Sequence, residues 1–150
     1  MGEGLTALLG TGAELRRPYY LALLAEGYRD SGRVGEGLGR LEEALAAVER
    51  TGERWCEAEL HRLRGELRLA DDGNEHQAAI SLHRAMDVAR SQNAAGLQLR
   101  AAVDLGRLQQ RQGETEGARR TLERNLGRFP EGSDSADLRT ARTLLEELRA

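Results

Sequence analysis

Apolar residues recur every three or four positions along most of the chain, and glycine-centred turns separate the apolar stretches. Three of these glycines, Gly32, Gly73 and Gly113, follow one another at intervals of 41 and 40 residues. Counted from each glycine, small residues stand five positions on and leucines nine positions on: Gly37, Ala78 and Ala118, then Leu41, Leu82 and Leu122. These offsets trace one face of a helix. The spacing indicates a repeat of helix, glycine turn and helix, in which each pair buries its apolar face against its neighbours.

The residue types favour helices over strands. Hydrophobic residues make up 39% of the chain and aromatic residues only 3%, so a core has to be built from Leu and Ala, which favour helices. No stretch alternates between apolar and polar positions as a half-buried strand would. We predict an all-α protein, a right-handed α-solenoid of antiparallel helix pairs. It has about three pairs, an N-terminal partial helix and a C-terminal cap helix.

The predicted boundaries divide one repeat domain, 1–150, into five parts. Residues 1–12 are the remnant of a preceding helix, 18–50, 53–92 and 94–130 are three repeats, and 134–149 are the cap helix. Leu5 and Leu8 align with Leu45 and Val48 of the first repeat, which indicates either a fragment of a longer array or a native chain with a short capping helix. At the other end, Ser133 or Asp134 can cap a helix with an apolar stripe of Leu138, Ala141, Leu145 and Leu148.

The small residue that precedes each turn marks the place where the two helices of a pair cross. In the second repeat this residue is Gly65. The pattern predicts that Gly65→Leu overpacks the crossing, whereas Gly65→Ala is tolerated or mildly stabilising through its helix propensity.

The small and large positions of the repeat resemble the tetratricopeptide pattern. The first copy, Leu24-Ala25-x-x-Tyr28 followed by Gly37, Leu41 and Ala44, is similar to it, and so is the third copy with Leu105-Gly106, Ala118, Leu122 and Pro130. Gln109 and Asn125 depart from the usual aromatic residue and alanine. The period also exceeds the usual length of about 34 residues, so the resemblance implies elongated repeats.

The central run from Thr51 to Leu67, TGERWCEAELHRLRGEL, carries a second resemblance. It resembles the C-terminal tetratricopeptide region of large bacterial multidomain proteins, in which a nucleotide cyclase or DNA-binding domain precedes a signalling ATPase. The resemblance implies a regulatory scaffold for signalling or transcription regulation, and not the enzyme of such a protein.

Charge and cysteine content limit the possible binding partners and cellular compartment. The formal net charge is -3, with acidic and basic residues interspersed, so no field attracts nucleic acid or an anionic membrane. Cys56 is the single cysteine, which excludes an intrachain disulfide and favours a reducing cytoplasm. The sequence shows neither a secretory signal nor an apolar run of membrane-spanning length. We therefore predict a cytoplasmic protein that binds neither nucleic acid nor membrane.

The candidates for chemistry do not form a catalytic or metal site. Cys56 and His61 are five residues apart, one more than the spacing that puts two ligands on one helical face. Cys56 shares its apolar phase with Leu60 and Leu63 and is interpreted as a core residue, while His76 and His83 are expected at the surface. No glycine-rich segment has the arrangement of a phosphate-binding loop. We predict no enzymatic activity, no cofactor and no metal.

The tetratricopeptide resemblance implies that the first helix of each pair lines a concave groove. Mapped onto this chain, the groove positions are Tyr19, Glu26 and Arg29, then Glu59, Arg62 and Glu66, then Arg100, Arg107 and Gln110. One interpretation is a groove that binds a peptide or helix, with Arg62, Arg100 and Arg107 facing solvent as carboxylate clamps. The other is a solvated face whose charges pair with one another, without an aromatic hot spot.

We accordingly expect a protein-protein interaction scaffold or regulatory module, part of a larger protein, whose partner is another protein, a peptide or a neighbouring domain of the same parent chain. The alternative is a ligand-responsive domain that holds a small effector between repeats and controls an attached ATPase or cyclase.

Overall fold

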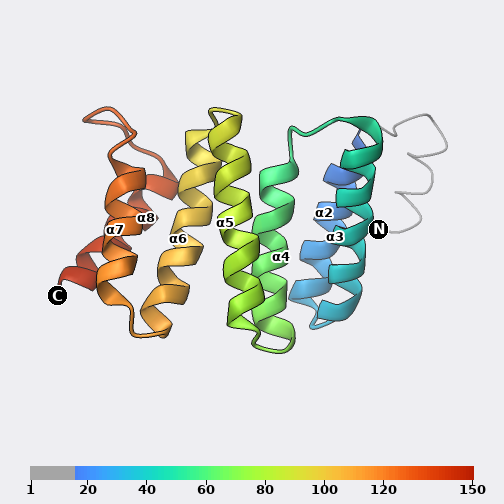
Figure 1. Cartoon of the computed structure of the whole chain (residues 1–150), viewed down its shortest axis with the longest axis horizontal. Helices are drawn as coiled ribbons and strands as arrows, with labels where there is room; N and C mark the ends of the chain where they lie inside the picture. Colours follow the sequence, from blue (N-terminus) through green and yellow to red (C-terminus); the bar gives the residue numbers. More distant parts are fainter. Residues whose placement is uncertain (1–15) are drawn as a thin grey trace.

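The computed structural model describes residues 16–150, and over that range its regular secondary structure is helical, without strands, so the all-α prediction is confirmed. Seven helices follow one another along the long axis of the molecule (Figure 1). They are α2 (Arg17–Asp30), α3 (Val34–Thr51), α4 (Glu57–Asp71), α5 (Glu75–Ser91), α6 (Ala95–Arg111), α7 (Thr115–Leu126) and α8 (Ala136–Arg149). The predicted partial helix at residues 1–12 lies outside the described residues.

Each of the three turn glycines lies between the two helices of one pair, at the position that the spacing in the sequence predicts. Gly32 separates α2 from α3, Gly73 separates α4 from α5, and Gly113 separates α6 from α7. Their φ angles are +80°, +67° and +79°, a left-handed conformation that is costly for a residue with a Cβ atom. The glycines therefore fix tight turns that place consecutive helices side by side.

Packing runs along the chain through several apolar clusters, with no single centre. One cluster joins α2, α3 and α4, a second joins α5 and α6, and a third joins α6, α7 and α8. Each helix contacts the next one in the chain, and α2, α4, α6 and α8 also contact one another in that order. This pattern of near-neighbour contacts is consistent with a helical repeat.

Gly65 sits at a tighter crossing than the sequence pattern suggests. A Cβ atom added there would lie 3.0 Å from Cγ of Leu82 and 3.2 Å from the carbonyl oxygen of Ala78, both on α5. A backbone oxygen cannot rotate away as the end of a side chain can. Even the single methyl group of an alanine is therefore crowded at this position, contrary to the tolerance that the sequence pattern predicts.

The C-terminal helix has the predicted apolar stripe but a different cap. Leu138, Ala141, Leu145 and Leu148 are all buried. The capping residue is Ser135, whose hydroxyl oxygen accepts a hydrogen bond from the backbone N–H of Leu138 at 3.2 Å, and neither Ser133 nor Asp134 has this role. Asp134 instead pairs with Arg139 at 2.8 Å. Ser135 lies three residues before the first buried leucine, the spacing that an N-cap requires.

Among residues 16–150, no helix combines the length and the apolar composition needed to cross a membrane.

Candidate functional site

A network of charged side chains connects the four helices α2, α4, α6 and α8, and Arg62 on α4 is its centre. The Arg62 guanidinium donates two hydrogen bonds to Glu59, at 2.9 and 2.6 Å, and one to Glu66 at 2.6 Å. It donates a further one to Asp104 on α6 at 2.8 Å. Only 11% of the Arg62 side chain is exposed. Three carboxylates therefore enclose this guanidinium.

Three other arginines extend the network to the neighbouring helices. The links are Arg29 with Glu66 at 2.5 Å, Arg100 with Asp137 at 3.0 Å and with Glu59 at 3.6 Å, and Arg107 with Asp104 at 3.8 Å. Arg29 lies on α2 and Asp137 on α8, so a continuous series of ion pairs runs from the first described helix to the last. Charged contacts thus supplement apolar packing between alternate helices.

Burial and neighbouring charge act in opposite directions at the centre of the network. Burial alone lowers the pKa of Arg62, but hydrogen bonds and charge from Glu59, together with Glu66 and Asp104, outweigh it and raise that pKa above the ordinary value. Burial raises the pKa of Asp104 to about 6, although the hydrogen bond from Arg62 lowers it and nearby Glu66 raises it further. Arg62 is therefore permanently charged, whereas Asp104 titrates in mildly acidic solution.

The structure brings six of the nine predicted groove residues into this network: Arg29, Glu59, Arg62, Glu66, Arg100 and Arg107. The expectation that Arg62 faces solvent is wrong, because the carboxylates around it leave 11% of the side chain exposed. Arg100 and Arg107 are accessible, with 43% and 55% of their side chains exposed. Glu26 is half-buried and Gln110 exposed, and Tyr19 lies apart in an aromatic group.

Asp104 is a network residue that the sequence pattern did not identify. It follows Arg100 by four positions and precedes Arg107 by three, which places all three side chains on one face of α6. That spacing was a usable signal. Its contact with Arg62 on α4 depends on how α4 and α6 pack, which helical periodicity alone does not define.

An aromatic group also differs from expectation, since the sequence showed no aromatic hot spot. Tyr19 and Trp55 are 42% and 50% exposed and their ring centroids are 5.6 Å apart, while those of Tyr19 and Tyr20 are 5.7 Å apart. With Arg16 and Glu53 these rings line a hollow of about 430 Å³. Trp55 belongs to the link between α3 and α4, because α4 begins at Glu57 and not at the start of the predicted second repeat.

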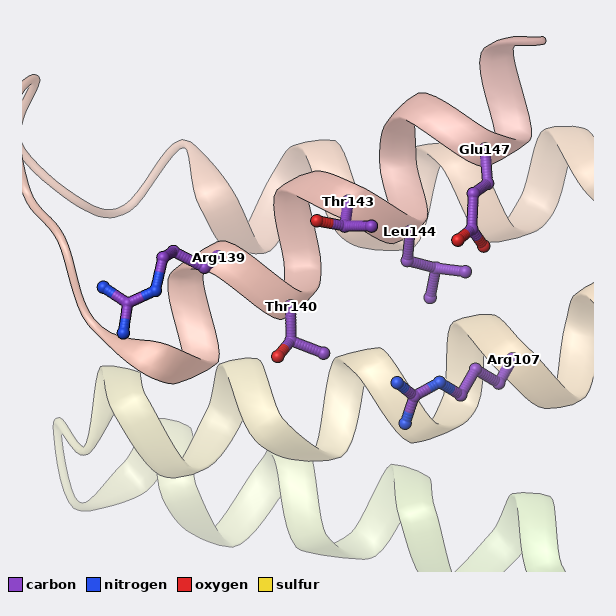
Figure 2. A pocket seen from close by; sticks show the side chains of 6 residues that line it. All are labelled: Arg107, Arg139, Thr140, Thr143, Leu144 and Glu147. Atoms are coloured by element: carbon purple, nitrogen blue, oxygen red, sulfur yellow. The ribbon is translucent and has the colours of Figure 1, made fainter.

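A second hollow, of about 280 Å³, lies between α6 and α8. Figure 2 shows Arg107 extending from α6 beneath Thr140, Thr143 and Leu144 of α8, with Glu147 directed from α8 towards α6. Arg139 lines the same hollow, but its guanidinium points away from the others. This hollow adjoins the charged network, since Arg107 lies 3.8 Å from Asp104.

Cys56 and His61 are both buried, at 6% exposure each, and have different surroundings. Cys56 packs among the apolar residues of α2, α3 and α4, as predicted, and burial raises the pKa of its thiol to about 11. His61 faces Glu57, with Nε2 3.6 Å from the carboxylate. Over the part of the chain that the structure describes, no group of three or more His, Cys, Asp and Glu side chains is arranged to hold a metal ion. His76 and His83 are exposed, as predicted.

Acidification should destabilise the protein through His61. Burial, reinforced by the charge of Arg64, lowers the pKa of His61 to about 4 despite the opposing effect of Glu57. The unfolded chain, with a histidine pKa near 6.5, takes up this proton first, so the contribution is complete above pH 6.5 and decreases as the pH falls towards 4. The full loss is on the order of 3 kcal/mol. Urea unfolding of wild type and His61→Gln over this range should show a difference that shrinks with acidification.

Taking the difference between the two proteins removes the opposite contribution of Asp104, whose raised pKa favours the folded state at low pH. A difference that stays constant from pH 7 to about 4 would contradict the assignment of a neutral, buried His61.

Comparison with known proteins adds one relative of undetermined function. No family model matches the sequence. Over 99 residues, which cover 66% of the chain, it is 34% identical to an uncharacterized protein of Rhizobium meliloti (strain 1021). The chain spans about a tenth of the length of that protein, because the match covers 10% of it. The tetratricopeptide resemblance therefore stays a prediction.

Proposed function

We propose that this chain is a tetratricopeptide-like α-solenoid that binds a peptide or helix of another protein, or of a neighbouring domain, along the face formed by α2, α4, α6 and α8. The observation that carries the proposal is the alignment of these four helices, which contact one another in order and contribute charged side chains to one shared network. An extended face of this kind suits an elongated partner. The much longer bacterial relative agrees with a module inside a larger protein.

The network changes which arginines are suited to contact a partner. Arg62 is already saturated by carboxylates of its own chain, and breaking those contacts would leave buried negative charge. Arg100 and Arg107 are more exposed and make fewer ion pairs. Among the described residues, Arg100 pairs with Glu59 and Asp137, and Arg107 pairs with Asp104 alone. These two arginines are the proposed contacts for the partner.

Partner capture should therefore depend on Arg100 and Arg107. Replacing both with glutamine removes two charges without placing new carboxylates beside Glu59 and Asp104, so helical content should remain unchanged. Pull-down from a lysate of the source organism should lose the specific partner in this variant. The matched control is Arg90→Gln with Arg120→Gln, exposed arginines on α5 and α7, which should retain it. Retention of the same partner by the Arg100 and Arg107 variant would reject this face as the binding surface.

The aromatic hollow favours a second candidate function, a domain that responds to a small effector. Its volume of about 430 Å³ and its lining of Tyr19, Tyr20 and Trp55 suit a planar molecule that stacks on the rings. Trp55 is the single tryptophan of the chain, so its fluorescence reports binding there directly. Titration with free nucleosides and aromatic amino acids tests this candidate: saturable quenching that Tyr19→Ala removes would support it, and unchanged fluorescence throughout would reject it.

A further inference from the structure

Arg107 differs from the other arginines on the shared face because it makes no hydrogen bond to another side chain among residues 16–150. Arg62, Arg29 and Arg100 each donate at least one hydrogen bond to a carboxylate, at 3.0 Å or less. Arg107 has only the charge of Asp104 at 3.8 Å, and that carboxylate already accepts a hydrogen bond from Arg62. Its five N–H donors are therefore available to a ligand.

The side of α8 that faces Arg107 carries two polar side chains without partners in the described part of the chain. Within residues 16–150, neither the Thr143 hydroxyl nor the Glu147 carboxylate has a hydrogen-bond or ion-pair partner. Leu144 also lines the hollow, but it is only 4% exposed and packs mainly in the core. Figure 2 shows the side chains of Leu144 and Glu147 directed from α8 towards α6. Among the residues that the structure describes, the hollow of about 280 Å³ thus combines the Arg107 guanidinium, held only by the pair with Asp104 at 3.8 Å, with the unpaired Glu147 carboxylate and the Thr143 hydroxyl. Its second guanidinium, that of Arg139, already pairs with Asp134 at 2.8 Å.

We infer that the hollow between α6 and α8 anchors a partner peptide through one acidic side chain, whose carboxylate binds Arg107 and the Thr143 hydroxyl, followed by one basic side chain that pairs with Glu147. This inference rests on the proposed function and deepens it, since it names the chemistry of the partner at one end of the shared face. Charge complementarity is its basis, because an acidic side chain of the peptide complements Arg107 and a basic one complements Glu147.

Size and charge select this ligand over two others. The hollow is smaller than the sites that enclose most of a drug-sized molecule, which occupy roughly 300–1,000 Å³, but it accommodates side chains of a peptide that runs along the surface. A phosphate group would bring a second negative charge close to Glu147, and like charges at short range are unfavourable. A carboxylate carries a single negative charge, so it can bind the Arg107 guanidinium with less repulsion from Glu147 than a phosphate group.

The test uses a defined peptide and the whole chain labelled with nitrogen-15. The probe is a capped, alanine-based helical peptide of about 16 residues with one Glu and one Lys four positions later. The matched control peptide carries Gln at both positions. The Glu–Lys peptide should shift the backbone amide signals of residues around Arg107, Thr143 and Glu147 in a saturable manner. The control peptide should bind at least about tenfold more weakly, because charge-assisted hydrogen bonds are lost.

Variants identify the contacts. Arg107→Gln should weaken binding of the Glu–Lys peptide by at least about tenfold. Glu147→Lys should weaken it too and reverse the preference, so that a peptide with Glu at both positions then binds more tightly. Both side chains are exposed and Arg107 has one distant pair, so the fold should be unaffected.

Equal binding of the Glu–Lys and control peptides, or no shifts at millimolar peptide, would overturn the inference. Shifts confined to residues near Arg100 and Tyr19 would also overturn it, yet would leave the proposed function intact. Failure of the proposed function would appear separately, in the pull-down, as partner capture that does not depend on Arg100 and Arg107.

Discussion

Replacing Arg62 with alanine should lower the free energy of unfolding by about 3 kcal/mol, a large part of the stability of a domain this size. The substitution leaves Glu59, Glu66 and Asp104 close together without the guanidinium that neutralises them, and these side chains are only 20%, 27% and 14% exposed. Breaking a buried pair typically costs 3–5 kcal/mol. The low end of that range applies because the carboxylates retain some contact with water and with the outer arginines.

Urea unfolding of three variants distinguishes this effect from the simple loss of an arginine. Arg107→Ala is the matched control, since its side chain is 55% exposed and has one pair at 3.8 Å, and it should cost less than about 1 kcal/mol. Adding Asp104→Asn to Arg62→Ala removes one uncompensated carboxylate and should restore part of the lost stability. If Arg62→Ala and Arg107→Ala prove equally stable, the network has no central role.

The pH dependence provides an independent check of the same prediction. The pKa of Asp104 is about 6 in the presence of Arg62, which lowers it, so losing Arg62 should raise that pKa further. A carboxyl group whose pKa is raised in the folded state contributes less stability as the pH rises through that value. The difference between wild type and Arg62→Ala should therefore be larger at about pH 8 than at about pH 5.

The helix pairs and their turns could be predicted from the sequence because their determinants are local. The turn glycines require a left-handed conformation, and the spacing of Leu41, Leu82 and Leu122 reflects one helical face, so both can be counted along the chain. The helix boundaries were harder to predict from the sequence. Ser133, Asp134 and Ser135 are all capping residue types, and only the register of Leu138 against the core selects Ser135.

The candidate site could be predicted only in part, because its contacts join helices that are about 40 residues apart in sequence. Glu59, Arg62 and Glu66 share one face of α4 at spacings of three and four, so their mutual contact follows from helical geometry. Whether such a group faces solvent or a neighbouring helix depends on the angle between α4 and α6. That angle brings Asp104 against Arg62 and converts an expected clamp for a partner into an internal contact.

The same dependence on packing explains the aromatic group. Tyr19 and Trp55 are 36 positions apart, and no periodic pattern relates a helix position to a residue in a link. Their contact depends on how the link between α3 and α4 passes over the beginning of α2, and so on where α4 starts. A sequence pattern that begins α4 several residues early places Trp55 inside a helix and hides the contact.

Gly65→Leu should destabilise the protein by at least about 3 kcal/mol, because α4 and α5 cross at this residue with no room for a side chain. Even the first added atom is crowded, since a Cβ would lie 3.0 Å from Cγ of Leu82 and 3.2 Å from the backbone oxygen of Ala78. This geometry revises the sequence-based expectation for Gly65→Ala. The helix propensity of alanine is favourable by about 1 kcal/mol, but overpacking costs about 1–3 kcal/mol, so we now expect net destabilisation.

Gly106, the corresponding glycine of the next helix pair, supplies the matched control. A Cβ atom added to Gly106 would lie 3.5 Å from Cγ of Leu122 and 3.6 Å from the nearest atom of Leu144, which are ordinary contact distances. Gly106→Ala should therefore stabilise the protein by up to about 1 kcal/mol, so the same substitution at equivalent positions has opposite signs. Urea unfolding of both alanine variants beside wild type measures this directly. Equal stability of Gly65→Ala and Gly106→Ala would show that α4 and α5 separate at the crossing more easily than their contacts indicate.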